Sequence, residues 1–191
     1  MKKAHLIALP LAAMLALSAC ANNTYAEVVR FHTNQPMNRG TIAIVPADPS
    51  IANSLEFRTH GETVAIELRR LGFTTGLPAT QTQYSAVVDV TQTDATGAVT
   101  RPGATVGVGG NVLGVQAPIG RRPTVVTNRS TTLSVQIKRN ADGVMIWEGR
   151  ASKEAETGTP GATATAAVPA LAGALFGDFP GTPGVTTNVR L

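Results

Sequence analysis

The sequence predicts an α+β fold, in which a single mixed or antiparallel sheet of about five to six strands carries two helices packed on one face. Three observations support this prediction. Several segments alternate between apolar and polar residues, two segments repeat apolar residues with helical spacing, and the order along the chain is strands, helix, strands, helix, strand. Placing both helices on one face of one sheet buries every apolar stripe with the fewest layers.

Two short strands are expected near the start of the domain. Residues 27–33 alternate between two faces, as a half-buried strand does. Residues 41–45 form a β-branched run that Pro46 closes, because proline has no N–H to donate to a ladder.

A first helix is expected to begin at Thr59, because Thr59 followed by Glu62 is a capping-box pattern. Each of these side chains would satisfy a backbone donor that the first turn leaves open. Gly72 suits the left-handed residue that ends a helix, and Phe73 can fold back as its apolar partner. The apolar stripe of this helix is Val64, Ala65, Leu68 and Leu71.

Two longer strands are expected over residues 84–93 and 124–139, because their apolar residues alternate. Residues 140–143 predict a hairpin turn, in which Gly143 is free to take a positive φ, and residues 144–151 return as the partner strand. Trp147 on this strand is expected to anchor the core. The inward positions on the two longer strands are Tyr84, Ala86, Val88, Val90, Leu133, Val135 and Ile137.

The end of the chain predicts a loop, a helix and a strand. Residues 152–161 are polar and loop-like, and residues 166–176 repeat apolar positions with helical spacing. Pro169 is tolerated only in a first turn, which favours a helix start near residue 166. Residues 185–191 are expected to add a closing edge strand.

A glycine-rich insertion at 101–122 separates the two longer strands. Its segment 102–120 carries no charge and is flanked by Arg101 and by Arg121 and Arg122. It matches neither a P-loop nor a dinucleotide-binding fingerprint. Two interpretations remain open: a surface loop, or an extension of the flanking strands into a hairpin whose uncharged tip touches lipid or a partner protein.

The N-terminus predicts a lipoprotein signal peptide over residues 1–19. Lys2 and Lys3 precede an apolar run that is too short to span a membrane comfortably, and small residues lead to Cys20, the only cysteine. The pattern Leu17-Ser18-Ala19-Cys20 resembles a lipobox, which implies cleavage between Ala19 and Cys20 and attachment of a diacylglycerol to the Cys20 thiol. Residues 20–26 would form a lipidated tether, and residues 27–191 a single periplasmic domain.

The expected location is the bacterial outer membrane, with the domain facing the periplasm. Residue 21 is alanine and not aspartate, which by resemblance to known sorting rules favours the outer membrane. The membrane is then a partner through the acyl chains on Cys20, because two or three chains make attachment effectively permanent.

Composition argues against several classes of function. Removal of Lys2 and Lys3 with the signal leaves little excess positive charge, and no basic stripe with interleaved aromatics indicates nucleic-acid binding. His32 and His60 are the only histidines after Cys20, so we expect no metal site and no cofactor. No Gly-x-Ser-x-Gly elbow or carboxylate pairing indicates catalytic residues, and we expect a non-enzyme.

Three segments carry a resemblance to a known family. They are residues 68–73 (Leu-Arg-Arg-Leu-Gly-Phe), residues 142–149 (Asp-Gly-Val-Met-Ile-Trp-Glu-Gly) and residues 175–180 (Leu-Phe-Gly-Asp-Phe-Pro). With these, the chain resembles the bacterial lipoproteins of the domain of unknown function 4136 family, roughly over residues 41–180. The resemblance implies a periplasm-facing α/β lipoprotein without an established activity, and the insertion at 102–120 departs from the family pattern.

Three functional hypotheses follow. The first is a non-enzymatic lipoprotein whose periplasmic domain binds an envelope protein or lipid, in an assembly role. The second is a subunit of an oligomeric outer-membrane pore or export apparatus that uses the glycine-rich hairpin. The third is a hydrolase whose site assembles only in space.

Overall fold

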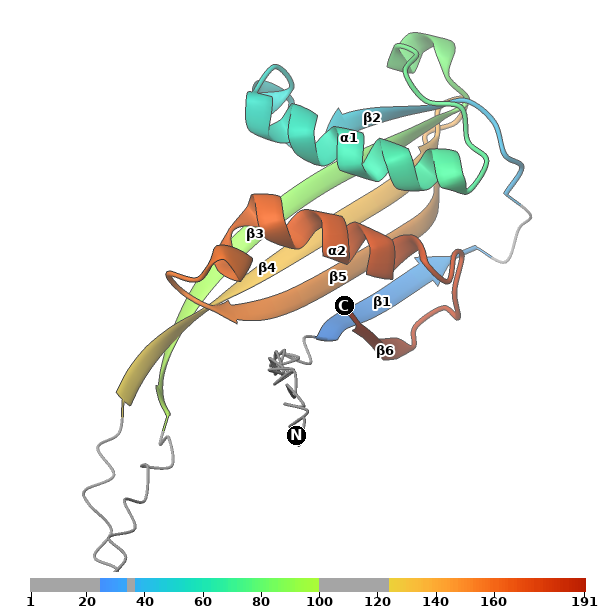
Figure 1. Ribbon diagram of the computed structural model, residues 1–191. Coiled ribbons are helices and arrows are strands. Elements are labelled where there is room, and N and C mark those ends of the chain that lie inside the picture. The colour runs from blue at the N-terminus through green and yellow to red at the C-terminus, as the bar shows by residue number, and fades with distance from the viewer. Residues whose placement is uncertain (1–24, 34–36, 100–123) are drawn as a thin grey trace, which may run out of the picture.

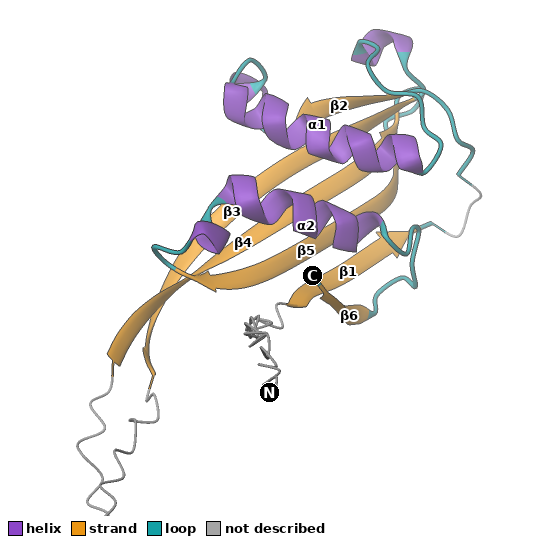
Figure 2. Ribbon diagram, viewed as in Figure 1, coloured by secondary structure: helices purple, strands orange, loops and turns teal. Residues whose placement is uncertain are grey.

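A six-stranded mixed sheet carries both long helices on one face (Figures 1 and 2). The computed structural model describes residues 25–33, 37–99 and 124–191. The strand order is β2-β3-β4-β5-β1-β6. The α+β fold class predicted from the sequence is confirmed, with six strands and two helices.

The strands are β1 (Tyr25–His32), β2 (Ile42–Pro46), β3 (Tyr84–Val99), β4 (Thr124–Arg139), β5 (Met145–Glu156) and β6 (Thr186–Arg190). The long helices are α1 (Leu55–Arg70) and α2 (Ala164–Phe176). Short 3₁₀ turns cover Pro49–Ile51, Ala79–Gln81 and Pro160–Ala162.

The only parallel pair among the described strands is β2 with β3, and α1 connects them as the crossover of a β-α-β unit. All the other neighbours are antiparallel. β1 lies between β5 and β6, so the first strand of the domain pairs with two of the last. The core lies between the sheet and the two helices.

The predicted inward rows on β3 and β4 are confirmed. Ala86, Val88, Leu133, Val135 and Ile137 are all buried. The helices contribute Val64 and Leu68 from α1 and Leu171, Leu175 and Phe176 from α2. Burial of such side chains is the main favourable term in folding.

The start of α1 differs from the prediction. The helix begins at Leu55, and the Ser54 side chain caps it by accepting a hydrogen bond from the Phe57 N–H at 3.0 Å. Thr59 lies in the second turn, where its hydroxyl donates to the Leu55 carbonyl at 2.9 Å. Glu62 pairs instead with Arg69. A local capping-box pattern therefore occurs inside a helix whose true cap, Ser54, stands five residues earlier.

Several boundaries also shift. β1 begins at Tyr25, two residues before the expected start of the domain, and Ala26 is fully buried. β5 continues to Glu156 through a segment expected to be a loop, because residues 152–156 pair with residues 128–132 of β4. β3 continues to Val99, and α2 begins at Ala164 with Thr163 as its N-cap.

Both predicted glycine turns are confirmed. Gly72 ends α1 with φ +93°, and the Phe73 N–H donates to the Leu68 carbonyl at 3.0 Å. Gly143 has φ +71° in the β4–β5 turn and donates its N–H to the Arg139 carbonyl at 2.8 Å. These two positions need the backbone freedom of glycine.

Candidate functional site

A two-stranded ribbon projects beyond the rest of the sheet (Figure 1). β3 and β4 pair without interruption from Tyr84 and Arg139 to Val99 and Thr124. β5 accompanies them only as far as the pair between Asn128 and Glu156. The segments 95–99 and 124–128 run outward from this point and are called the projecting ribbon here. The insertion expected at 101–122 joins its two strands and lies outside the described residues.

An ion pair closes the base of the projecting ribbon. The Arg129 guanidinium donates two hydrogen bonds to the Asp94 carboxylate, at 2.6 Å and 2.8 Å. These hydrogen bonds lower the pKa of Asp94, and the same contacts raise the pKa of Arg129. Beyond this pair the projecting ribbon contains no charged residue.

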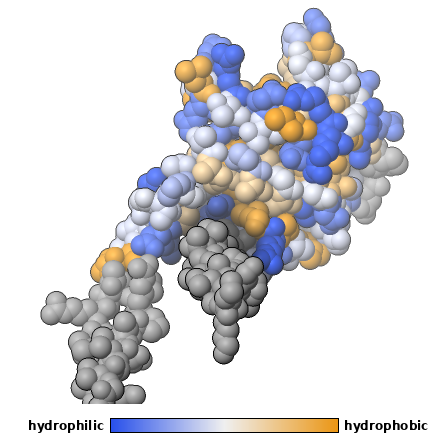
Figure 3. Space-filling model, in the orientation of Figure 1, coloured by the Kyte–Doolittle hydropathy of each residue, from blue (hydrophilic) through white to orange (hydrophobic). Residues whose placement is uncertain are grey.

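The tip of the described ribbon is partly apolar. Val125 is 68% exposed, and Figure 3 shows hydrophobic surface at the ribbon's end. The threonines Thr96 and Thr127 face each other across the two strands, with their hydroxyl oxygens 3.3 Å apart. The ribbon therefore presents a neutral surface of threonine and valine.

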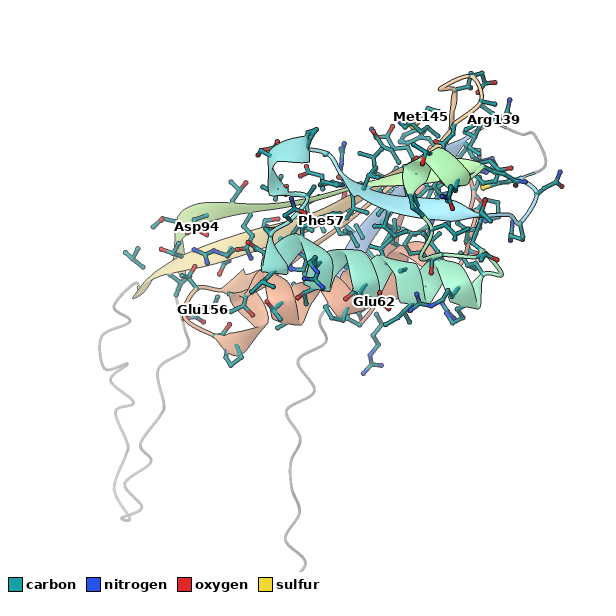
Figure 4. The ribbon with its side chains drawn as sticks, turned by 90° about the horizontal axis from the view of Figure 1, so that it is seen from above. Phe57, Glu62, Asp94, Arg139, Met145 and Glu156 are labelled. Carbon is teal, nitrogen blue, oxygen red and sulfur yellow. The ribbon has the colours of Figure 1, made fainter. Side chains whose placement is uncertain are left out.

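The start of β1 lies at the same end of the sheet as the projecting ribbon. Glu27 pairs with Ser152, and Ser152 pairs with Thr132, so the chain enters the sheet near the end of β5 and level with the middle of β4 (Figure 1). Figure 4 shows Asp94 and Glu156 at this end and Arg139 and Met145 at the other. Cys20 precedes Tyr25 by five residues and, like the predicted signal peptide, lies outside the described residues.

A groove of about 760 Å³ is open at this end. Its lining combines the start of β1, the last residues of β5, the turn that follows β5, and single residues of β4 and β6, and it includes Tyr25, Glu27, Lys153, Glu154 and Asn188. Glu27, Lys153 and Glu154 form no ion pair within the described part of the chain. The groove is a polar surface at the point where the chain enters the domain.

The two histidines lie on different elements. His60 on α1 is only 4% exposed, and its Nε2 has no hydrogen-bond partner among the described residues. Burial lowers the pKa of His60, and the nearby Glu56 carboxylate opposes that shift. The Nε2 of His32 on β1 lies 3.0 Å from the Gly181 carbonyl oxygen. Within residues 25–33, 37–99 and 124–191, no three His, Cys, Asp or Glu side chains gather to hold a metal ion.

Arg30 is a buried charge that sequence reasoning did not single out. It lies on β1, is 3% exposed, and donates to the carbonyls of Ala174 and Leu175 at 2.7 Å and 2.8 Å. It therefore caps the C-terminal, negative end of α2. Burial lowers the pKa of Arg30, and the Asp178 carboxylate opposes that shift. Its role is structural.

The three segments that carry the family resemblance meet in one aromatic cluster. Trp147 stacks on Phe176 at 5.6 Å between ring centroids and lies 5.2 Å from Phe179. Phe73 meets Phe179 edge to face at 6.4 Å. The Trp147 indole N–H donates to the Pro180 carbonyl at 3.0 Å. Trp147 is 1% exposed, which confirms it as a core anchor.

A family model described as "Domain of unknown function (DUF4136)" matches residues 23–181. The chain belongs to this family. The resemblance read from the three segments is confirmed, and their convergence in the aromatic cluster gives a physical reason for it. None of the described helices is long and apolar enough to cross a bilayer.

The chain is also similar to an uncharacterised protein of Zymomonas mobilis. The two are 28% identical over 211 residues, which cover 86% of this chain and 80% of that protein.

Solved structures show weaker likeness. A PDZ domain protein from Parabacteroides distasonis matches with a TM-score of 0.49 and 13% identity, over 87% of this chain. The match spans only 39% of the length of that protein. The PelC dodecamer from Paraburkholderia phytofirmans matches with a TM-score of 0.40 and 10% identity, over 79% of this chain and 91% of that one.

Proposed function

We propose that the protein is an outer-membrane lipoprotein whose periplasmic domain is non-enzymatic and binds the envelope through its projecting ribbon. Acyl chains on Cys20 would hold the domain at the bilayer. The observation that carries the proposal is the shared end of the sheet: the start of β1 and the projecting ribbon leave the domain on the same side.

The lengths involved support this arrangement. A chain of five residues spans at most about 18 Å, so an anchor at Cys20 keeps the bilayer within that distance of Tyr25. By the sheet register, the projecting ribbon runs about 20 Å beyond the level of Tyr25, at about 3.3 Å per residue. If the domain is anchored at Cys20 and the end of the sheet near Tyr25 faces the bilayer, the projecting ribbon would reach the lipid headgroups.

The chemistry of the ribbon fits that position. A charged side chain is costly to bring into an apolar environment without a partner, and the projecting ribbon carries none. Asp94 and Arg129, at its base, neutralise each other. The exposed Val125 gains from contact with apolar groups, whether these belong to lipid or to a partner protein in the membrane.

Acylation is the first requirement of the proposal. Mass spectrometry of the protein purified from its native membrane should find the chain beginning at Cys20 and carrying acyl chains. Cell fractionation should place it in the outer membrane and retain it there through a high-salt wash. In the matched control, Cys20→Ala, processing at residue 20 should fail. An unmodified thiol at Cys20, or a native protein recovered in the soluble fraction, would end the proposal.

A further inference from the structure

A second groove, of about 420 Å³, lies at the opposite long edge of the sheet, between α1 and β2. Ile44 of β2 forms one side and α1 contributes Phe57 and Ala65, while Leu77 comes from the segment after α1. Gly61 also lines the groove, and the absence of a side chain there keeps the space beside Ile44 open.

Some backbone N–H and C=O groups of β2 point away from β3, toward the edge of the sheet that borders this groove. The Ala47 N–H donates to the Val88 carbonyl of β3, whereas the Ile42 N–H donates outward to the Thr74 carbonyl; both distances are 2.9 Å. Alternate residues of a strand direct their backbone groups to opposite neighbours, so Ile44, like Ile42, directs its N–H and C=O outward.

The segment after α1 pairs with this edge of β2 only at its start. Thr74 forms a parallel bridge with Thr41, and its N–H donates to the Gly40 carbonyl at 3.0 Å. Gly76 then turns the chain with φ +92°, and no further backbone hydrogen bond to this edge is formed within the described residues. The Ile42 carbonyl and both backbone groups of Ile44 are left for another strand.

The charges around the groove favour an anionic occupant. Arg58 and Arg69 line it, and Glu62 is the only acid among its lining residues. Arg69 contacts the Glu62 carboxylate and the Thr75 hydroxyl. Arg58 forms no ion pair with any described residue, so its positive charge is free to meet a carboxylate.

We propose that this groove binds an extended segment of a partner protein, which adds a short strand to the outer edge of β2 where Thr74 leaves it. The segment would place an apolar side chain among Ile44, Phe57 and Leu77 and a carboxylate beside Arg58. Backbone hydrogen bonds supply affinity in this mode of recognition, and the side-chain pocket supplies selectivity. The inference goes beyond the proposed function and does not depend on acylation of Cys20.

The test begins with a random octapeptide phage library selected on the purified mature protein. The enriched peptide is synthesised with a fluorescent label and its affinity is measured by anisotropy. We expect an apolar residue and a carboxylate in the enriched sequences. A version of the peptide with an amidated C-terminus distinguishes a terminal carboxylate from an acidic side chain.

Two substitutions at one position isolate the strand addition. Ile44→Pro removes the outward N–H without removing a bond to β3, and Ile44→Val keeps the N–H. Affinity should fall at least about tenfold in Ile44→Pro and change less than about twofold in Ile44→Val. Arg58→Glu should weaken binding by about tenfold as well. Thermal melts check that each variant folds.

Amide hydrogen exchange provides a readout that needs no variant. In the free protein the Ile44 amide should exchange much faster than the Val45 amide, which faces β3, and the bound peptide should slow exchange at Ile44. The inference is overturned if no peptide is enriched, if Ile44→Pro binds as tightly as the unmodified protein, or if exchange at Ile44 does not change. A dimer seen by light scattering that Ile44→Pro disrupts would make a second copy the occupant and would equally overturn it.

Discussion

At the scale of single residues, Arg30 carries the strongest prediction. Its guanidinium is the partner of two carbonyls at the end of α2, and a hydrogen bond to a charged group contributes about 1.5–3 kcal/mol. Replacing Arg30 with methionine, which has a similar apolar stem, should lower the free energy of unfolding by about 2–4 kcal/mol. Urea denaturation measures this change.

Arg30→Lys is the matched control, because it keeps the charge but offers a single donor group. It should recover part of the loss. Equal stability of Arg30→Met and the unmodified protein would show that Arg30 does not cap α2.

His60 predicts a dependence of stability on pH. Burial lowers its pKa in the folded protein, so the unfolded chain binds a proton more readily below about pH 6.5. The contribution of His60 to stability is present above that pH and is lost as the pH falls toward the lowered pKa of the folded state. Urea denaturation at pH 7.5 and pH 5.5 should show this loss.

His60→Leu removes the titrating group and should flatten the pH dependence between these two values. An NMR titration that placed the pKa of His60 at or above its ordinary value would contradict the expectation.

Prediction from sequence worked for residues whose burial follows from the pattern of their own element. Trp147 was expected in the core because it stands on an alternating strand, and it is buried. Arg30 stands on a strand of the same kind, but its partners are 144 and 145 positions away in the sequence. No local pattern reports such a contact.

At the scale of elements, the two candidate N-caps of α1 can be told apart. Ser54→Ala removes the side chain that accepts from the Phe57 N–H and should cost about 1 kcal/mol of stability. Thr59→Ala removes a hydroxyl inside the helix and should change stability little, since alanine favours helices. Thermal denaturation compares the stability of the two variants. A larger loss of stability in Thr59→Ala than in Ser54→Ala would contradict the assignment of Ser54 as the cap.

Substitution of glycine by alanine is expected to change the free energy of unfolding in opposite directions at two positions. A Cβ at Gly149 would clash with the Trp147 ring and lie 2.8 Å from Leu175 Cδ1, so Gly149→Ala should destabilise the protein by about 1–3 kcal/mol. A Cβ at Gly61 in α1 would lie 3.4 Å from Ile44 Cγ2, an ordinary contact. Gly61→Ala should therefore stabilise by about 0.5–1 kcal/mol. Urea denaturation of both variants tests the pair, and a shared sign would contradict it.

Elements were predicted more reliably than their ends. Apolar alternation located the long strands and a β-branched run located β2, but the polar continuation of β5 through residues 152–156 has no apolar face to signal it. These residues are strand because β4 extends beside them. The start of α1 was missed because Thr59 and Glu62 form a capping-box pattern inside the helix, although Phe57 in the first turn already packs against the core.

At the scale of the whole molecule, the strand order decides at which end of the sheet the chain enters the domain. The sheet and both helices followed from the sequence pattern, but the pairing of β1 between β5 and β6 did not. That pairing places Tyr25 at the end from which β3 and β4 project. The groove beside β2 was likewise not foreseen, because it depends on where Thr74 leaves the sheet.

The central claim of the proposed function is an orientation: a domain anchored through Cys20 would lie with its projecting ribbon toward the bilayer. Acylation would leave the mature chain without a free thiol, so Val125→Cys and Ala141→Cys each offer one labelling site. Val125 lies near the start of β4 and Ala141 lies in the turn after its end, about 45 Å apart. A bimane label on each variant is read in proteoliposomes containing lipids with quencher-labelled headgroups. The account predicts strong quenching at residue 125 and little at residue 141. Equal quenching at the two sites, or stronger quenching at residue 141, would contradict it.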